Sequence, residues 1–155
     1  MALNVKWILD QNPKEKIVLW AHNGHVARGR MSYRSMGEEL HDMYGAQMVV
    51  LGFAFNRGSF QAMAAGGGGL RTFTVPAAPA GSFDAILGSA GIPLFALDLR
   101  GAPPSLREPR LTRQIGAVFA SDNASAYLAR ASLPALYDAM LFVENTTAAR
   151  PNDRR

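Results

Sequence analysis

The chain has 155 residues, of which 48% are apolar and 18% are charged. This composition predicts one folded domain and excludes intrinsic disorder, which requires low hydrophobicity and high net charge. The net charge is +4, but the basic residues are scattered, so we expect no nucleic-acid interface. The sequence has no cysteine and no run of 18 apolar residues, so we expect no disulfide, no thiol catalysis and no membrane partner. A cytoplasmic location is the expectation.

The first elements have clear hydrophobic periods. Apolar residues at helical spacing predict a helix over residues 1–9, and Asn12-Pro13 would end it. The continuous apolar run 17–21 predicts a strand buried on both faces, as in a parallel sheet. The polar segment 22–25 follows this strand directly.

Cap residues mark the next helix. Ser35 precedes a helix predicted over 36–43, and Gly45 would terminate it. A second strand is expected over 47–55, followed by a turn over 57–60.

The second half contains shorter elements. We expect a loop at Gly66–Gly69, a strand at 71–75, a helix at 83–89 capped by Ser82 and a strand at 94–99. Residues 110–120 are predicted to form a short helix followed by a strand at 117–119. A weak helix or loop at 124–131 and a strand at 137–144 complete the chain. Alternating strands and helices predict an α/β fold: a layered sheet, mainly parallel or mixed, with flanking helices. We expect residues 1–145 to form the folded region and residues 146–155 to form a polar, disordered tail.

Two histidines follow the first predicted strand. His22 and His25 flank Asn23-Gly24, and ligands in open α/β sheets bind beyond the carboxyl ends of strands. Imidazole can take a proton from water and return it near neutral pH, so the pair is a candidate for acid–base chemistry. The alternatives are two loop histidines that bond nearby carbonyls, or a metal site with a third ligand that the spacing does not reveal. His41 lies in a predicted amphipathic helix and is expected at the surface.

Two further groups of residues are candidates. Asp98 and Arg100 end a predicted strand, where they would form an ion pair, orient a histidine or bind a carboxylate. Phe53, Phe55 and Phe60 cluster near the second strand, where they would pack in the core or line an apolar pocket.

Several motifs together resemble the erythromycin esterase family. The resemblance rests on Lys16-Ile17-Val18-Leu19-Trp20-Ala21-His22-Asn23-Gly24-His25-Val26-Ala27-Arg28, Met36-Gly37-Glu38-Glu39-Leu40, Leu51-Gly52-Phe53-Ala54-Phe55, Gly58-Ser59-Phe60-Gln61-Ala62, Leu97-Asp98-Leu99-Arg100 and Tyr137 to Thr147. It implies a metal-independent hydrolase without a cofactor, in which water attacks a macrolide lactone or another small-molecule ester. Such an enzyme would confer antibiotic resistance.

The resemblance also implies roles for individual residues. It places His25 as general base and His22 as its partner, which orients water or stabilises the oxyanion. The residues predicted to bind substrate are Asn23, Arg28, Phe53 and Phe55.

Family members are two to three times longer than this chain, and the resemblance covers only their C-terminal half. A further Glu and His of the family's active site lie in the other half. The expected partners are therefore an N-terminal half or a second copy of the chain, together with the substrate. The alternative function is a non-catalytic fragment that binds a small molecule or another protein.

Overall fold

The computed structural model describes residues 1–31 and 33–150. Residues 151–155 of the predicted tail lie outside this part, so its disorder stays a prediction. The elements in chain order are α1 (Ala2–Gln11), α2 (Asn23–Val26), α3 (Met36–Tyr44), η1 (Gly45–Gln47), β1 (Leu51–Ala64), β2 (Leu70–Val75), α4 (Phe83–Gly88), β3 (Leu94–Asp98), α5 (Pro104–Arg107), β4 (Arg110–Arg113), β5 (Val118–Phe119), η2 (Ser121–Tyr127), β6 (Leu128–Ala131), α6 (Leu133–Leu136) and β7 (Ala139–Thr146). No helix in the described ranges is long and apolar enough to cross a bilayer.

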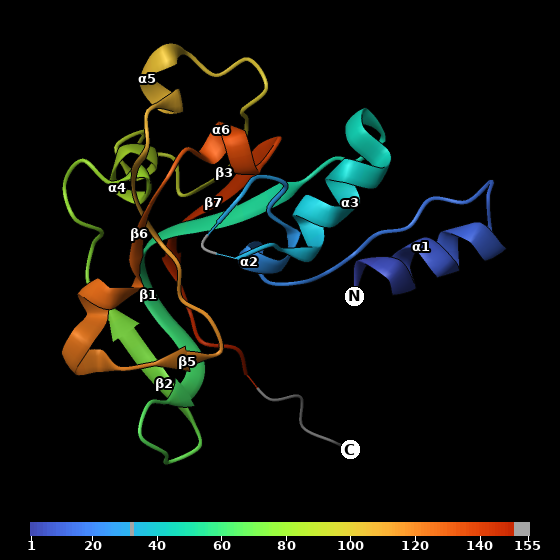
Figure 1. Cartoon of the computed structure of the whole chain (residues 1–155). Helices are drawn as coiled ribbons and strands as arrows, with labels where there is room; N and C mark the ends of the chain where they lie inside the picture. Colours follow the sequence, from blue (N-terminus) through green and yellow to red (C-terminus); the bar gives the residue numbers. More distant parts are fainter. Residues whose placement is uncertain (32, 151–155) are drawn as a thin grey trace.

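The main sheet is mixed. Its strand order is β2-β1-β7-β3, and β5 pairs with the end of β1 (Figure 1). β1 is parallel to β7 and β5, whereas β2 and β3 are antiparallel to their neighbours. β4 and β6 form a separate antiparallel pair. The predicted α/β class with a mixed sheet is therefore confirmed.

β1 is longer than predicted, and the turn expected at 57–60 is wrong. The strand continues through Gly58, which pairs with Val75 of β2 and Thr146 of β7 and has φ of 120°. A side chain there would bring a Cβ to 2.2 Å from the Thr146 carbonyl oxygen. Glycine therefore lets the strand bend, as Figure 1 shows, without losing either neighbour.

The predicted caps are confirmed. The Ser35 hydroxyl accepts a hydrogen bond from the Glu38 amide at the start of α3, and Ser82 accepts one from the Ala85 amide at the start of α4. Gly45 ends α3 with a positive φ of 50°. Local side-chain chemistry set these boundaries, so the sequence alone identified them.

Three other expectations are wrong. The segment 17–21 is not a strand, because no described strand pairs with it, and its Val18 is 91% exposed. The short helix expected after residue 110 is the strand β4, and the weak helix or loop expected at 124–131 ends in the strand β6. β4 and β6 stabilise each other by pairing, which local propensity does not reveal.

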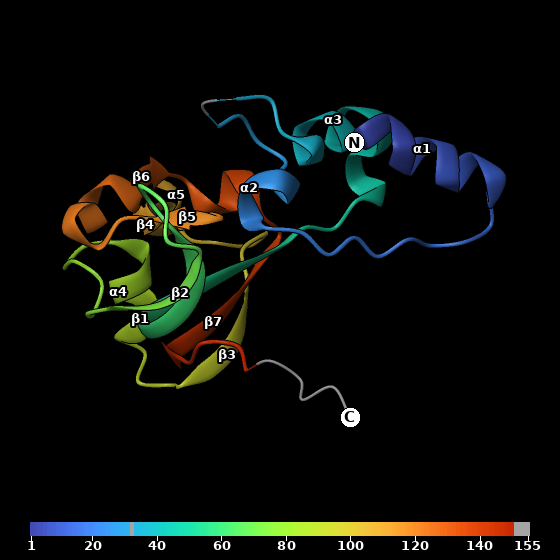
Figure 2. The same cartoon turned by 90° about the horizontal axis from the view of Figure 1, so that it is seen from below.

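The core covers one face of the main sheet. Gly52 and Ala54 of β1 lie on this face, level with Met140 and Phe142 of β7. Helices α4 and α6 pack on the same face through the buried side chains of Phe83, Leu87, Leu133 and Leu136. In Figure 2 the helices α1, α2, α3 and α5 lie above β7 and β3, and α4 lies beside β1.

Candidate functional site

His22 is held by both of its ring nitrogens. It caps α2, where its Nδ1 accepts a hydrogen bond of 3.2 Å from the Gly24 amide. Its Nε2 lies 2.7 Å from the Ile115 carbonyl oxygen, which can only accept, so Nε2 carries the proton. His22 therefore has a fixed tautomer, and it ties α2 to the segment before β5.

His25 lies one turn further along α2. Its ring centroid is 6.4 Å from that of His22, with the two planes at 80°. The side chain is exposed, and within the described ranges its ring nitrogens make no hydrogen bond. Of the two histidines, His25 is therefore the one with a nitrogen available to a water molecule.

The side chain of Asn23 binds the backbone of β1. Its amide nitrogen donates to the Phe53 carbonyl at 2.6 Å, and its oxygen accepts from the Phe53 amide at 2.9 Å. A neighbouring strand would make this same pair of bonds. Asn23 thus fixes residues 22–28, called the histidine loop, against the edge of β1 that faces away from β7.

Arg28 is engaged with the protein itself. Its guanidinium pairs with Asp138 and donates to the carbonyls of Pro134 at 2.8 Å and Tyr137 at 3.2 Å. The second oxygen of Asp138 accepts from the Val50 amide at 2.8 Å. This network joins the end of the histidine loop to β1 and β7. Sequence analysis missed Asp138, although an acidic residue at the start of an apolar strand was a usable signal.

Two tyrosines enclose the histidine loop. Tyr33 donates to the Gly24 carbonyl at 3.1 Å, and the Tyr137 hydroxyl lies 3.5 Å from the Asn23 carbonyl. A Cβ on Gly24 would lie 2.6 Å from the Tyr33 hydroxyl, so a larger residue there would require the Tyr33 side chain to shift. Burial raises the pKa of Tyr137 to about 12. Sequence analysis identified neither tyrosine as part of the site.

The two candidate phenylalanines have different surroundings. Phe53 is 45% exposed, and its ring meets that of Trp20 edge-on at 5.4 Å. Phe55 is half-buried against Phe60, with the Arg113 guanidinium 5.5 Å above its ring. Of these two phenylalanines, Phe53 is therefore the one with an accessible aromatic surface beside the histidine loop.

Asp98 and Arg100 form an exposed ion pair, at 2.6 Å between Oδ2 and a guanidinium nitrogen. Hydrogen bonds from Arg100 lower the pKa of Asp98 to about 2. The interpretation of these residues as an ion pair therefore agrees with the structure, and neither bonds to a histidine.

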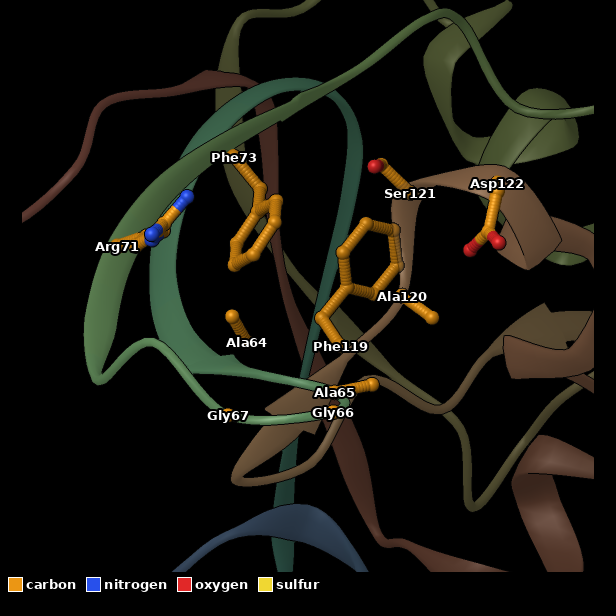
Figure 3. Close-up of a pocket in the computed structure, with 10 residues that line it drawn as sticks. All are labelled: Ala64, Ala65, Gly66, Gly67, Arg71, Phe73, Phe119, Ala120, Ser121 and Asp122. Atoms are coloured by element: carbon orange, nitrogen blue, oxygen red, sulfur yellow. The ribbon is translucent and has the colours of Figure 1, made fainter.

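A separate hollow of about 470 Å³ lies at the other end of β1 (Figure 3). Phe73 and Phe119 line it, and in Figure 3 they lie between Arg71 and Asp122. Neither histidine lines it. The described residues contain no group of three or more His, Cys, Asp or Glu side chains placed to hold a metal ion.

Comparison of the sequence with models of known protein families identifies the family of this chain. The sequence model of the erythromycin esterase family matches residues 1–146. The chain belongs to the erythromycin esterase family. The resemblance of the motif around the two histidines is thereby confirmed at the level of the family.

Solved structures agree on the fold. A protein from Bacillus cereus matches with a TM-score of 0.83 at 22% identity, and a succinoglycan biosynthesis protein matches with 0.81 at 23%; each match covers 94% of this chain and 37% of the other chain. A mutant of the erythromycin esterase EreC in its open conformation matches with 0.66 at 18% identity, over 93% of this chain and 35% of that one. The chain thus spans little more than a third of the length of these neighbours.

Proposed function

We propose that this chain contributes to an esterase-type hydrolase in which His25 is the general base. A water oxygen attacks the carbonyl carbon of a small-molecule ester or macrolide lactone while His25 takes the water proton. The proton then passes to the departing alkoxide, so that acid and alcohol are the products. Family membership supports this proposal, and so does the exposed ring of His25, which bonds to none of the described residues and lies beside the fixed ring of His22. The accessible ring of His25 is the observation that carries it.

His22 acts in this proposal as a positioning residue. Because both of its nitrogens bond to the protein, it offers no free donor to an oxyanion. Its contact with Ile115 instead fixes the direction from which α2 presents His25. The additional Glu and His that the family resemblance implies would come from the part of the fold that this chain does not cover.

The residues predicted to bind substrate divide into two roles. We assign Phe53, with Trp20, to an apolar wall for the substrate, because both rings are exposed next to the loop. Asn23 and Arg28 support the site by holding the loop on β1 and β7. Phe55 contributes from beneath, as a half-buried side chain.

Hydrolysis by single histidine variants tests the base. The rates with erythromycin and with simple aryl esters would be compared for wild type, His25→Asn, His22→Asn and His41→Asn. His41 lies on α3 and is the matched control, since it is the only other histidine. We expect His25→Asn to reduce kcat by about 100-fold or more, which is typical for loss of a general base. A wild-type rate in His25→Asn would overturn the assignment.

The assay is run on the chain alone and on the chain joined to the part of the Bacillus cereus neighbour that it does not cover, in the order of that neighbour's sequence. We expect His41→Asn to retain the wild-type rate in both. No hydrolysis in either form would overturn the proposed function.

A further inference from the structure

The carbonyl that bonds to His22 lies at the end of a ribbon that is separate from the main sheet. Among the described strands, β4 and β6 pair only with each other. The Gln114 amide continues this pairing by donating to the Tyr127 carbonyl at 2.7 Å. Ile115 follows directly, in a stretch without helix or strand that leads to β5. The position of the Ile115 carbonyl therefore depends on how the ribbon is attached to the rest of the molecule.

The buried carboxylate of Asp84 makes the first attachment. Asp84 lies in the first turn of α4, is 1% exposed, and accepts a hydrogen bond of 3.0 Å from the Arg113 amide at the end of β4. Burial raises the pKa of this carboxyl, and the bond from the Arg113 amide opposes the rise. The bond holds the main chain two residues before Ile115.

The guanidinium of Arg113 makes the second attachment. One of its nitrogens donates to the Pro76 carbonyl at 2.6 Å and to the carbonyl of Asn56, on β1, at 3.1 Å. The centre of the Phe55 ring lies 5.5 Å from the guanidinium carbon. Asp84 and Arg113 thus fasten the end of the ribbon to both α4 and β1.

This attachment is polar although it is buried. Asp84 Oδ1 and Arg113 Nε are both buried and have no hydrogen-bond partner among the described residues. Apolar side chains of similar volume often stabilise a buried site more than an incompletely bonded charged pair does. The directed bonds of this pair fix the backbone of Arg113, which apolar contacts would not do. A role in setting direction accounts for this polarity better than a role in stability alone.

We propose that Asp84 and Arg113 are positioning residues of the histidine pair, which act by fixing the Ile115 carbonyl opposite Nε2 of His22. That carbonyl draws the ring proton to Nε2, so Nδ1 is free to accept a bond from the Gly24 amide. The bond from Gly24 caps α2, the helix that carries His25. If the carbonyl moves away, either nitrogen can carry the proton, and a protonated Nδ1 cannot cap the helix.

This inference rests on the proposed function only for its effect on the rate of hydrolysis. The tautomer of His22 is a property of the folded chain and does not depend on turnover. Asp84 and Arg113 lie outside the histidine loop, so their effect on it passes through Ile115.

Long-range proton–nitrogen correlation spectra of the chain test the proposal, since they report which ring nitrogen of each histidine carries a proton. The chain has three histidines, so His22→Asn and His25→Asn assign the signals. At pH 8, where imidazole is ordinarily neutral, we expect wild-type His22 to be protonated on Nε2 alone. In Asp84→Ala and in Arg113→Met, we expect the signals of its two nitrogens to move toward each other as both tautomers become populated.

Two control variants separate direction from stability. Asp84→Asn keeps an oxygen for the Arg113 amide, so we expect it to retain the wild-type spectrum of His22. Leu87→Ala removes a buried side chain from the same helix without touching either attachment, so it should lower stability and leave the His22 spectrum unchanged.

A wild-type His22 spectrum in both Asp84→Ala and Arg113→Met would overturn the proposal. The same spectral change in Leu87→Ala would also overturn it, because general loosening would then explain the effect. If Asp84→Ala does not fold, Arg113→Met decides by the same readout.

Hydrolysis by Arg113→Met in the joined protein measures the consequence for the rate. Because Arg113 acts through the histidines rather than on the substrate, we expect kcat to fall by about 10- to 100-fold and KM to stay within about twofold of wild type. An unchanged kcat in a variant with a mixed His22 ring would overturn the positioning role. Absence of hydrolysis by the wild type would count against the proposed function alone, since the spectra do not depend on turnover.

Discussion

Arg28 offers the sharpest test of whether a residue of the histidine motif supports the fold or binds substrate. Its side chain is 20% exposed and that of its partner Asp138 is 11% exposed. The pair is therefore nearer to the buried limit, where removing one partner costs about 3–5 kcal/mol, than to the surface limit of about 0.2–1 kcal/mol. Arg28 also loses two bonds to carbonyls on truncation. We expect Arg28→Ala to lower the free energy of unfolding by about 2–4 kcal/mol.

Urea unfolding followed by circular dichroism measures this change. Arg28→Ala, Asp138→Asn and the double variant form a cycle, in which we expect a coupling energy of at least about 1 kcal/mol. Arg34→Ala is the control, because Arg34 pairs with Asp42 at the surface, where both side chains are at least 50% exposed. Its loss should cost about 0.5 kcal/mol or less.

A coupling energy near zero would refute this reasoning. So would an Arg28→Ala variant with wild-type stability and a raised KM for the ester. That second result would show a guanidinium free to bind substrate, as the sequence alone predicted.

Two further predictions concern α3 and the tyrosine beneath the loop. In Gly37→Ala the new Cβ would lie 2.0 Å from the Val26 carbonyl oxygen, so we expect urea unfolding to show a loss of about 3 kcal/mol in the free energy of unfolding. The control is Gly101→Ala, where a Cβ meets nothing within 4 Å and the loss should be less than about 1 kcal/mol. Equal stabilities of the two variants would contradict the close approach of α3 to α2. The pKa of Tyr137 is about 12 in the folded chain and about 10 in the unfolded chain. Its contribution to the free energy of unfolding is therefore complete below pH 10 and is lost as the pH rises from 10 to 12. Tyr137→Phe should therefore lose less stability than wild type between pH 8 and pH 11, and an equal loss would show that another group governs alkaline unfolding.

Features that depend on neighbouring residues could be predicted from the sequence. Ser35 and Ser82 accept bonds from their own helices, so cap rules located α3 and α4. The apolar runs of β3 and β7 were found because their composition fits strands on its own. The histidine motif was recognisable because its residues are contiguous, and it led to the correct family.

Features that depend on distant partners were decided only by the tertiary structure. The run 17–21 reads as a buried strand, but a strand exists only where another supplies hydrogen bonds, and none of the described strands does so. Similarly, β4 and β6 have weak propensities and exist because they pair with each other. Gly58 reads as a turn, yet contacts on both sides keep it within β1.

The same division holds at the site. The sequence determined that two imidazoles lie three residues apart, on either side of Asn23 and Gly24. Only the folded chain decided that the carbonyl of Ile115, 93 residues away, bonds to the ring of His22, whereas the ring of His25 stays open to water. It likewise brought Arg28 to Asp138 across 110 residues. The physical reason is that hydrogen bonds and ion pairs form between groups that packing brings together, whereas sequence patterns report only each segment's own preferences.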